Sequence, residues 1–183
     1  MFTVLEKEHI TQAKADIRNY VKRYKEQLYP NMPWVSIFLS GGAITSILRN
    51  EKINDFDFYF KTELSKKIGI ETLVLMYKDR IKEYDPQYNT GSIQGDKLIT
   101  DNAVTMIDGS QFITCMYGQP AEIKLSFDFL HCCPHYDTLE DQLYISKAQY
   151  GAIMNKKLIY RDPVKMAKSF RLHKFTQRGW VLA

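Results

Sequence analysis

The spacing of apolar residues along the chain predicts an alternation of helices and short strands. In residues 4–28, apolar side chains recur every three or four positions, which predicts an amphipathic helix with lysines and arginines on its other face. Further helices are predicted over residues 43–48, 63–83, 139–150 and 163–177. A short apolar run at 34–39 and an alternating run at 56–60 predict two strands.

The middle of the chain is rich in strand-forming residues. Three runs, at 103–107, 111–117 and 122–129, predict an antiparallel meander, and an Asp-Gly dipeptide between the first two is a hairpin signal. The polar stretch 85–96 predicts a loop, which is either a connector or a flap over a site. Together these elements predict an α+β fold, in which a mixed or antiparallel sheet is flanked by helices and followed by a C-terminal helical extension.

Composition narrows the class of protein without naming an activity. The 183 residues suit one domain, or one core with a small appendage, and the net charge of +4 fits a polyanionic partner. Most of the 12 Tyr and 10 Phe lie in apolar runs, so packing is favoured over stacking on bases. We find no uninterrupted apolar run of membrane-spanning length and no signal-peptide core, so we expect no membrane partner and a cytoplasmic location (the host cytoplasm if the protein is viral).

Three cysteines occur without the spacing of a disulfide framework. Reduced thiols are the simple interpretation of Cys115, Cys132 and Cys133. His131 and His135 flank two of them, but this cluster is too crowded for the spacers of a structural zinc site. We therefore read His131 as a structural residue.

The strongest candidate chemistry lies in one short segment. Ser40, Gly41 and Gly42 follow a predicted strand and precede a predicted helix. Glycines let backbone N–H groups approach a polyphosphate, and a helix N-terminus favours negative charge. Asp55 and Asp57 are two residues apart on an extended segment, so their side chains share a face. Two converging carboxylates form a hard-oxygen site that suits Mg²⁺ better than zinc.

This order of strand, diglycine, helix and paired acids resembles the DNA polymerase β-like nucleotidyltransferase superfamily. Its members include CCA-adding enzymes, poly(A) polymerases and small proteins of phages and other viruses, and the compact chain looks most like the last group. The resemblance implies that Ser40, Gly41 and Gly42 hold nucleotide phosphates. It also implies that Asp55, Asp57 and a third acid hold two Mg²⁺ ions, with Mn²⁺ as the alternative metal.

Asp128 is the candidate for the third acid. It lies in the apolar run 122–129, where a carboxylate must be paired, metal-bound or exposed on a sheet face. By resemblance its position matches the third catalytic carboxylate of the superfamily, which could also act as a general base. Asp101 and Asp108 compete, but both lie beside turn residues, where Asp is common.

The C-terminal segment carries clustered cations. Asp162 and Pro163 can start a helix that Gly179 ends. One face of that helix would then carry basic residues, namely Lys168, Arg171 and Arg178 or Lys174. The segment resembles the helical neck that follows the catalytic head of CCA-adding enzymes, which implies that Arg171 and Lys174 contact a triphosphate or base. A solvated basic face is an equally good interpretation.

The resemblance predicts two regions, a catalytic core over 1–137 and a neck-like extension over 138–183. The function it implies is Mg²⁺-dependent transfer of an NMP from an NTP to a hydroxyl, most readily an RNA (tRNA) 3′ end. A protein acceptor, as in toxin-type transferases, and a nucleotide- or RNA-binding module without turnover are the alternatives. The usual Arg-Asp pair after the glycines and the Glu-Asp-x-x-Arg base template are absent, and no motif indicates the base or the oligomeric state.

Overall fold

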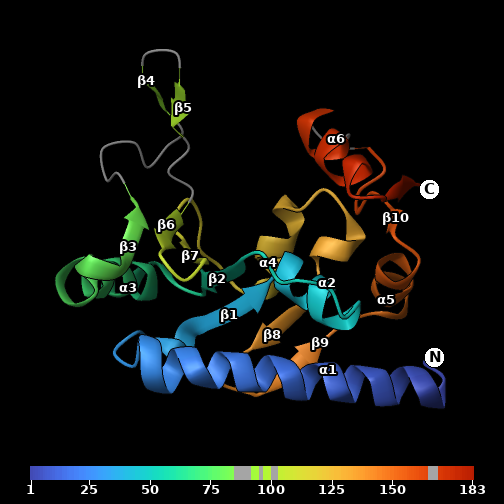
Figure 1. Cartoon of the computed structure of the whole chain (residues 1–183), viewed down its shortest axis with the longest axis horizontal. Coiled ribbons are helices and arrows are strands. Elements are labelled where there is room, and N and C mark those ends of the chain that lie inside the picture. Colours follow the sequence, from blue (N-terminus) through green and yellow to red (C-terminus); the bar gives the residue numbers. More distant parts are fainter. Residues whose placement is uncertain (85–91, 95–96, 100–102, 165–168) are drawn as a thin grey trace.

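A mixed β-sheet with helices on both faces forms the centre of the molecule (Figure 1). The computed structural model describes residues 1–84, 92–94, 97–99, 103–164 and 169–183. Within them the main sheet has seven strands, in the order β3-β6-β7-β2-β1-β8-β9. Their bounds are β1 Ile37–Ser40, β2 Phe56–Phe60, β3 Ile81–Glu83, β6 Ala103–Met106, β7 Ser110–Ile113, β8 His135–Asp137 and β9 Gln142–Tyr144. The predicted α+β class, with a mixed sheet flanked by helices, is confirmed.

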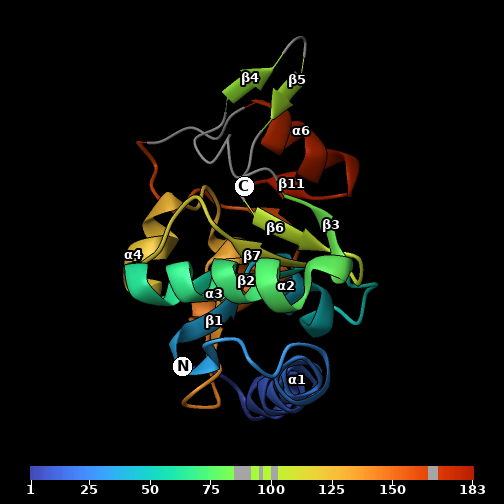
Figure 2. The same ribbon diagram turned by 90° about the vertical axis from the view of Figure 1, so that its left-hand side faces the viewer.

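Most neighbouring strands of the main sheet are antiparallel, while β2 and β7 run parallel. Two small two-stranded sheets accompany it, formed by β4 (Ser92–Gln94) with β5 (Lys97–Ile99) and by β10 (Lys157–Leu158) with β11 (Val181–Leu182). The helices are α1 Val4–Arg23, α2 Gly42–Leu48, α3 Glu63–Met76, α4 Pro120–Ile123, α5 Lys147–Met154 and α6 Ser169–Gln177. In Figures 1 and 2, α1 lies below the sheet and α6 lies at the opposite side of the molecule. Among the described residues, no helix combines the length and apolar character needed to cross a bilayer.

Alternation along β2 separates the core from the site. Phe56, Phe58 and Phe60 point into the main hydrophobic core, which also contains buried residues of α1 and α3. Tyr59 belongs to a second apolar cluster on the other face of the sheet. Because side chains of a strand alternate, Asp57 lies on the same face as Tyr59 and away from the main core.

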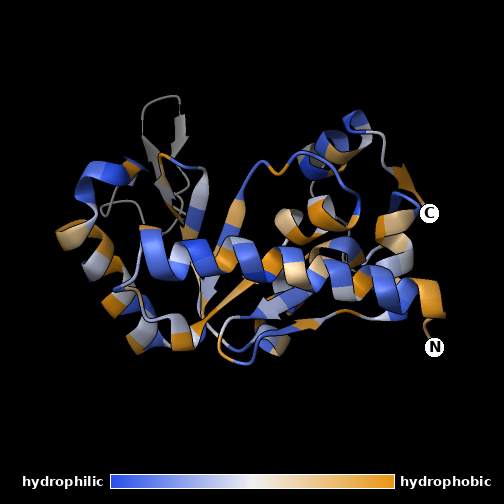
Figure 3. Cartoon of the chain, turned by 60° about the horizontal axis from the view of Figure 1, so that its bottom comes forward, coloured by the Kyte–Doolittle hydropathy of each residue, from blue (hydrophilic) through white to orange (hydrophobic). Residues whose placement is uncertain are grey.

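The first helix is amphipathic, as its spacing predicts. Thr3 and Glu6 form a reciprocal capping box at its start, and Ala13, Ile17 and Val21 are its buried residues. Figure 3 shows α1 across the front of the molecule with mainly hydrophilic residues on its visible side. The helix ends at Arg23 and a π-helical turn, Tyr24–Leu28, completes the segment predicted as one helix.

The third helix is shorter than predicted. It ends at Met76, and the remainder of the predicted 63–83 helix forms a 3₁₀ turn and the edge strand β3. Gly69 does not interrupt it, because this glycine packs on the sheet: a Cβ there would lie 2.3 Å from Cε1 of Phe60. The glycine thus permits close helix-to-strand contact.

The predicted meander is correct for two strands and wrong for the third. β6 and β7 form the antiparallel hairpin expected around the Asp-Gly turn, although β7 ends at Ile113 rather than 117. The predicted strand 122–129 is replaced by α4 and a 3₁₀ turn, Lys124–Ser126. Pro120 occupies the first turn of α4 and the Glu122 carboxylate accepts from the backbone N–H of Gln119, so local capping outweighs the apolar alternation.

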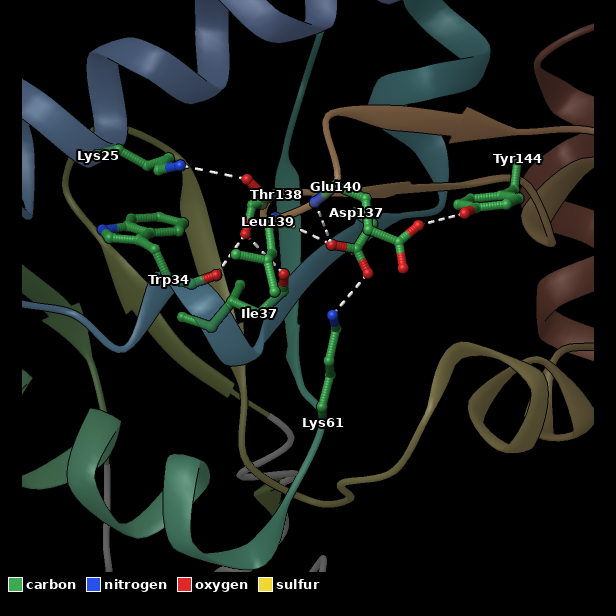
Figure 4. A network of polar contacts seen from close by, with 9 residues as sticks. All are labelled: Lys25, Trp34, Ile37, Lys61, Asp137, Thr138, Leu139, Glu140 and Tyr144. Atoms are coloured by element: carbon green, nitrogen blue, oxygen red, sulfur yellow. Dashed lines mark hydrogen bonds and ion pairs between the residues drawn. The ribbon is translucent and has the colours of Figure 1, made fainter.

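The predicted helix 139–150 is also wrong in its first half. Asp137 accepts hydrogen bonds from the N–H groups of Leu139 and Glu140, which turns the chain into β9 (Figure 4). Ser146 then caps α5, which continues to Met154. The division at residue 137/138 remains a prediction, and the main sheet extends past it through β9.

The C-terminal helix starts later than predicted. Residues 163 and 164 are not helical; the Asp162 carboxylate accepts from the N–H of Val164, and residues 165–168 lie outside the described part. The helix ends before Gly179, as predicted, and β11 then pairs with β10. The predicted loop 85–96 contains strand β4, and the rest of that stretch lies outside the described residues.

Candidate active site

The diglycine joins β1 to α2 in a conformation that requires glycine. Gly41 has φ +86°, and a Cβ added to it would lie 3.4 Å from Oδ2 of Asp57. A Cβ on Gly42 would meet no atom within 4 Å. The first turn of α2 therefore begins directly beside Asp57 of the neighbouring strand β2. Gly41 permits this close approach because it has no side chain.

Two features of Asp57 favour a cation next to its carboxylate. Its Oδ1 atom is buried and has no hydrogen-bond partner. Burial raises the pKa of Asp57 to about 6, the negative charge of Asp55 adds to the rise, and the positive charge of Lys174 opposes it. Asp55 is exposed at the start of β2. Both carboxylates line one cavity, so the predicted convergence of these two residues is present in the structure.

That cavity has a volume of about 440 Å³ and lies between the diglycine and the C-terminal helix. Gly41, Gly42, Asp55 and Asp57 line one side. The described lining residues include more cations than acids: Lys52, Lys156, Arg171, Lys174 and Arg178 against Glu51, Asp55 and Asp57. The space therefore suits a polyanionic ligand.

One face of α6 supplies the opposite wall. Arg171, Lys174, Phe175 and Arg178 all line the cavity, and their spacing of three and four residues puts them on one side of a helix. The structure thus brings Arg171 and Lys174 to the same cavity as Asp55 and Asp57. Their assignment as nucleotide ligands remains a prediction.

Asp128 occupies a different setting from the one predicted. It lies in a bend after the 3₁₀ turn Lys124–Ser126 rather than on a strand, and its carboxylate pairs with Arg171 at 2.8 Å. The residues that the structure describes contain no group of three or more His, Cys, Asp or Glu placed to hold a metal ion. Asp128 therefore remains a predicted metal ligand. In that role its carboxylate would have to leave Arg171 and bind a metal ion instead.

The hydroxyl group of Ser40 makes hydrogen bonds within the fold. Its side chain is buried, and its hydroxyl donates to the carbonyl oxygens of Pro134 at 2.7 Å and Cys132 at 3.2 Å. In the same region, the Thr45 hydroxyl donates to the carbonyl of His131 at 3.1 Å. These two hydroxyls fix the segment after Asp128 against β1 and α2, and Ser40 is not among the described residues that line the cavity.

Two lysines that line the cavity were not predicted from the sequence. Lys52 and Lys156 line the cavity, but no motif in the sequence marks them. Lys156 has φ +49°, and its Nζ donates to the carbonyl of Arg178 at 3.0 Å and lies 3.7 Å from Oε1 of Glu51. It thus fastens the C-terminal end of α6 to the loop that follows α2.

An aromatic cluster holds α6 and the C-terminal segment against the rest of the site. His131 stacks on Trp180 with ring centroids 4.2 Å apart and meets Phe175 edge-on at 4.6 Å. Burial lowers the pKa of His131 to about 4, and the charge of Arg171 adds to this effect, so the ring is neutral at physiological pH. This packing agrees with a structural role for His131, but the sequence did not indicate that it borders the cavity.

Comparison with known proteins finds one family model that covers most of the chain. A family model described as "Gad2: Gabija anti-defense 2 family protein" matches residues 11–156. No curated protein matches the chain.

Solved structures share the fold at low sequence identity. A Bacillus stearothermophilus CCA-adding enzyme in complex with CTP has a TM-score of 0.58 and 13% identity, over 93% of this chain and 41% of that one. A Thermotoga maritima CCA-adding enzyme complexed with tRNA has a TM-score of 0.55 and 12% identity, over 94% and 42%. This chain thus spans about two fifths of the length of those enzymes. The expected resemblance to this nucleotidyltransferase superfamily is confirmed for the fold, while a phage or viral origin remains a prediction.

Proposed function

The chain belongs to the Gabija anti-defense 2 family, and we propose that it acts there as a metal-dependent nucleotidyltransferase. In this proposal an NMP is moved from an NTP to a hydroxyl group, most readily at an RNA 3′ end, and the transfer serves the anti-defence role in the family's description. The observation that carries the proposal is the position of Asp57 in a cavity faced by Lys174 and Arg171. Its Oδ1 atom is buried without a hydrogen-bond partner, and its Oδ2 atom lies beside Gly41.

The donor set fits a hard divalent cation. Asp57 has a raised pKa because it is buried and close to Asp55, and a bound cation would relieve both effects. Carboxylate oxygens are the ligands that Mg²⁺ and Mn²⁺ take in proteins. Asp55 and Asp57 would hold the metal, with Asp128 as the proposed third ligand. When bound, divalent cations neutralise phosphate charge and lower the pKa of an attacking hydroxyl.

The remaining roles belong to groups of the chain itself. Gly41 and Gly42 let the backbone approach the phosphates at the start of α2, where N–H groups lack helical partners. Lys174 and Arg171 face them from α6 and balance negative charge that develops on the leaving pyrophosphate. Lys156 keeps α6 in place through the Arg178 carbonyl.

An RNA acceptor is supported by the charge of the site and by the neighbours. Two of the solved structures that share the fold are complexes with tRNA. The cavity here has a surplus of cations after its acids are counted, which favours a second polyanion next to the NTP. A protein hydroxyl is the other acceptor that an experiment can detect.

The test is transfer from each α-³²P-labelled NTP, with Mg²⁺ or Mn²⁺, to total RNA and to protein. We expect labelled RNA with the wild type and loss of at least about a thousandfold in Asp57→Asn, because that change removes a charged metal ligand but keeps the shape of the side chain. Asp16→Asn, at a partly exposed position of α1 that does not line the cavity, is the matched control and should keep full activity. Undiminished transfer by Asp57→Asn would refute the assignment of the site, and label in protein would change the acceptor.

A further inference from the structure

We infer that the cavity holds the nucleobase of its NTP by stacking between Phe127 and Phe175, and therefore accepts all four bases with similar affinity. The inference rests on the proposed function, because it concerns the base of the same NTP. It goes beyond that function by naming how the base is held and how selective the enzyme is.

Four aromatic residues and one histidine line the cavity, but most of their rings are already covered. Tyr59 is 7% exposed and stacks on Phe38, with centroids 5.3 Å apart at 15°. Trp180 is 6% exposed and stacks on His131. These rings can border a ligand, but they offer no free face on which a base could stack.

Phe127 and Phe175 are different, because both are partly exposed within the cavity. Phe127 meets Tyr59 at 67°, with centroids 5.8 Å apart, so no ring is stacked on it there. Phe175 is perpendicular to both Phe129 and His131, so neither of these rings stacks on it either. The two phenylalanines come from different elements, the turn before Asp128 and α6, and both pack against the same apolar cluster.

Their position relative to the charges fits an NTP. On α6, Phe175 directly follows Lys174 and is one turn beyond Arg171 on the cavity face. A triphosphate beside these cations would leave its base next to the phenyl ring. Base–aromatic stacking tolerates any base, since each has a π face.

Two polar groups close to these rings are covered. The Thr45 hydroxyl donates to the His131 carbonyl. The His131 residue is 3% exposed beneath Trp180, and its Nδ1 atom is buried. Selection of one base requires hydrogen-bonding groups that would be left unpaired by the wrong base. The covered state of Thr45 and His131 therefore favours a site with little base selectivity.

The experiment compares nucleotides with a ligand that has no base. The α,β-methylene analogues of ATP, GTP, CTP and UTP, which cannot transfer their NMP, are titrated by calorimetry in Mg²⁺ beside inorganic tripolyphosphate. We expect dissociation constants within about fivefold for the four analogues, each tighter than that of tripolyphosphate. Phe175→Leu should weaken the four analogues about tenfold, which corresponds to roughly 1.4 kcal/mol, and should leave tripolyphosphate unchanged.

Phe127→Leu provides a second variant, since Phe175 also packs on His131. It should show the same loss for nucleotides alone. Phe2→Leu, a partly exposed phenylalanine that packs on Tyr150 away from the cavity, is the matched control and should change nothing.

The outcomes separate the two proposals. Equal binding of tripolyphosphate and nucleotides, or variants that weaken all ligands equally, would overturn the stacking inference and leave the proposed function standing. A preference of a hundredfold for one base would likewise overturn it. If none of the five ligands binds, both the proposed function and this inference are refuted.

Discussion

At the scale of single residues, the contact between Gly41 and Asp57 defines the site. The glycine takes φ +86° and ψ −145°, a conformation that side chains disfavour, and it stands 3.4 Å (from its would-be Cβ) from a carboxylate oxygen. Gly42, one residue later, has neither constraint. The two glycines of the motif therefore have different functions, although the sequence presents them as a pair.

This difference predicts unequal effects of the same substitution. Gly41→Ala should lower transfer at least about tenfold and destabilise the fold by roughly 1–3 kcal/mol, because it forces a side chain into a disfavoured conformation beside Asp57. Gly42→Ala, the matched control, should keep the stability of the wild type within about 0.5 kcal/mol. Urea unfolding and the transfer assay measure both effects. Equal losses in the two variants would contradict this account of Gly41.

How much of the site the sequence could predict depends on the range of each interaction. Asp55, Asp57 and Gly41 lie close together in the chain, so alternation and spacing were sufficient to place them. Lys156 reaches the cavity because distant elements fold together, and nothing in its local sequence indicates it. Lys52 lies between Gly41 and Asp55 in the chain but belongs to no motif that marks it. Ser40 shows the opposite case, since its neighbours suggested a phosphate ligand while its hydroxyl bonds two backbone carbonyls.

At the scale of elements, a nearly buried ion pair anchors the turn between β8 and β9. Lys61 pairs with Asp137, and their side chains are 12% and 6% exposed (Figure 4). Burial works to raise the pKa of Asp137, but hydrogen bonds from Lys61 and from the N–H groups of Glu140 and Leu139 hold it below its usual value. The pair thus joins the end of β2 to the end of β8, where the turn into β9 begins.

Removing one partner of this pair should be costly. Lys61→Met should lower the free energy of unfolding by about 3 kcal/mol, because it leaves a nearly buried carboxylate without its cation. Lys147→Met breaks a solvent-accessible pair with Glu6, whose members are 47% and 25% exposed, and should cost much less, because solvent screens such a pair. Chemical denaturation of both variants checks this difference. Similar small losses would show that the Lys61 pair is not structural.

The elements that the sequence predicted well are those with strong local patterns. β2 was predicted at its observed bounds, and α2 within one residue, because apolar alternation and the diglycine delimit them. The predictions for segments 122–129 and 139–150 were wrong because local capping decides their structure. Pro120 starts a helix, and Asp137 closes a turn. Side-chain-to-backbone bonds of this kind compete with the periodicity on which the prediction was based.

At the scale of the whole molecule, buried neutral histidines make the fold sensitive to acid. Burial lowers the pKa of His131 to about 4, with a further effect from Arg171. Burial also lowers the pKa of His135 to about 4, although the charge of Asp137 opposes the shift. An unfolded histidine titrates near pH 6.5, so the unfolded chain binds more protons than the folded one between about pH 6.5 and pH 4.

The stability that these two histidines contribute should therefore fall as pH decreases from about 6.5 to 4, with the full contribution present above 6.5. For His131 this loss amounts to roughly 3 kcal/mol at most, from its shift of pKa. Urea midpoints at pH 7.0, 5.5 and 4.5 measure it. His131→Phe should show a shallower pH dependence than the wild type, whereas His173→Phe, an exposed histidine of α6, should keep the wild-type slope. An unchanged slope in His131→Phe would show that His131 titrates alike in the folded and the unfolded chain.

The molecule as a whole places a rigid sheet on one side of the cavity and a helix held by a few contacts on the other. Asp55, Asp57 and the diglycine belong to the sheet side. The helix α6 is attached through the Arg171–Asp128 pair, the Lys156 contact and the stack of Trp180 on His131. The fold class could be predicted from the pattern of apolar residues. The enclosure of the cavity could not, because it depends on contacts between segments more than 20 residues apart, and periodicity carries no information on such contacts.

The most direct test of the central claim follows the two ends of the triphosphate. Wild-type protein is incubated with RNA, Mg²⁺ and an NTP labelled with ³²P at either the α or the γ phosphate, and the label in RNA and in pyrophosphate is measured. A nucleotidyltransferase puts the α label into RNA and releases the γ label as pyrophosphate, and Asp57→Asn should do neither. Incorporation of the γ label, or release of inorganic phosphate without labelled product, would contradict the account.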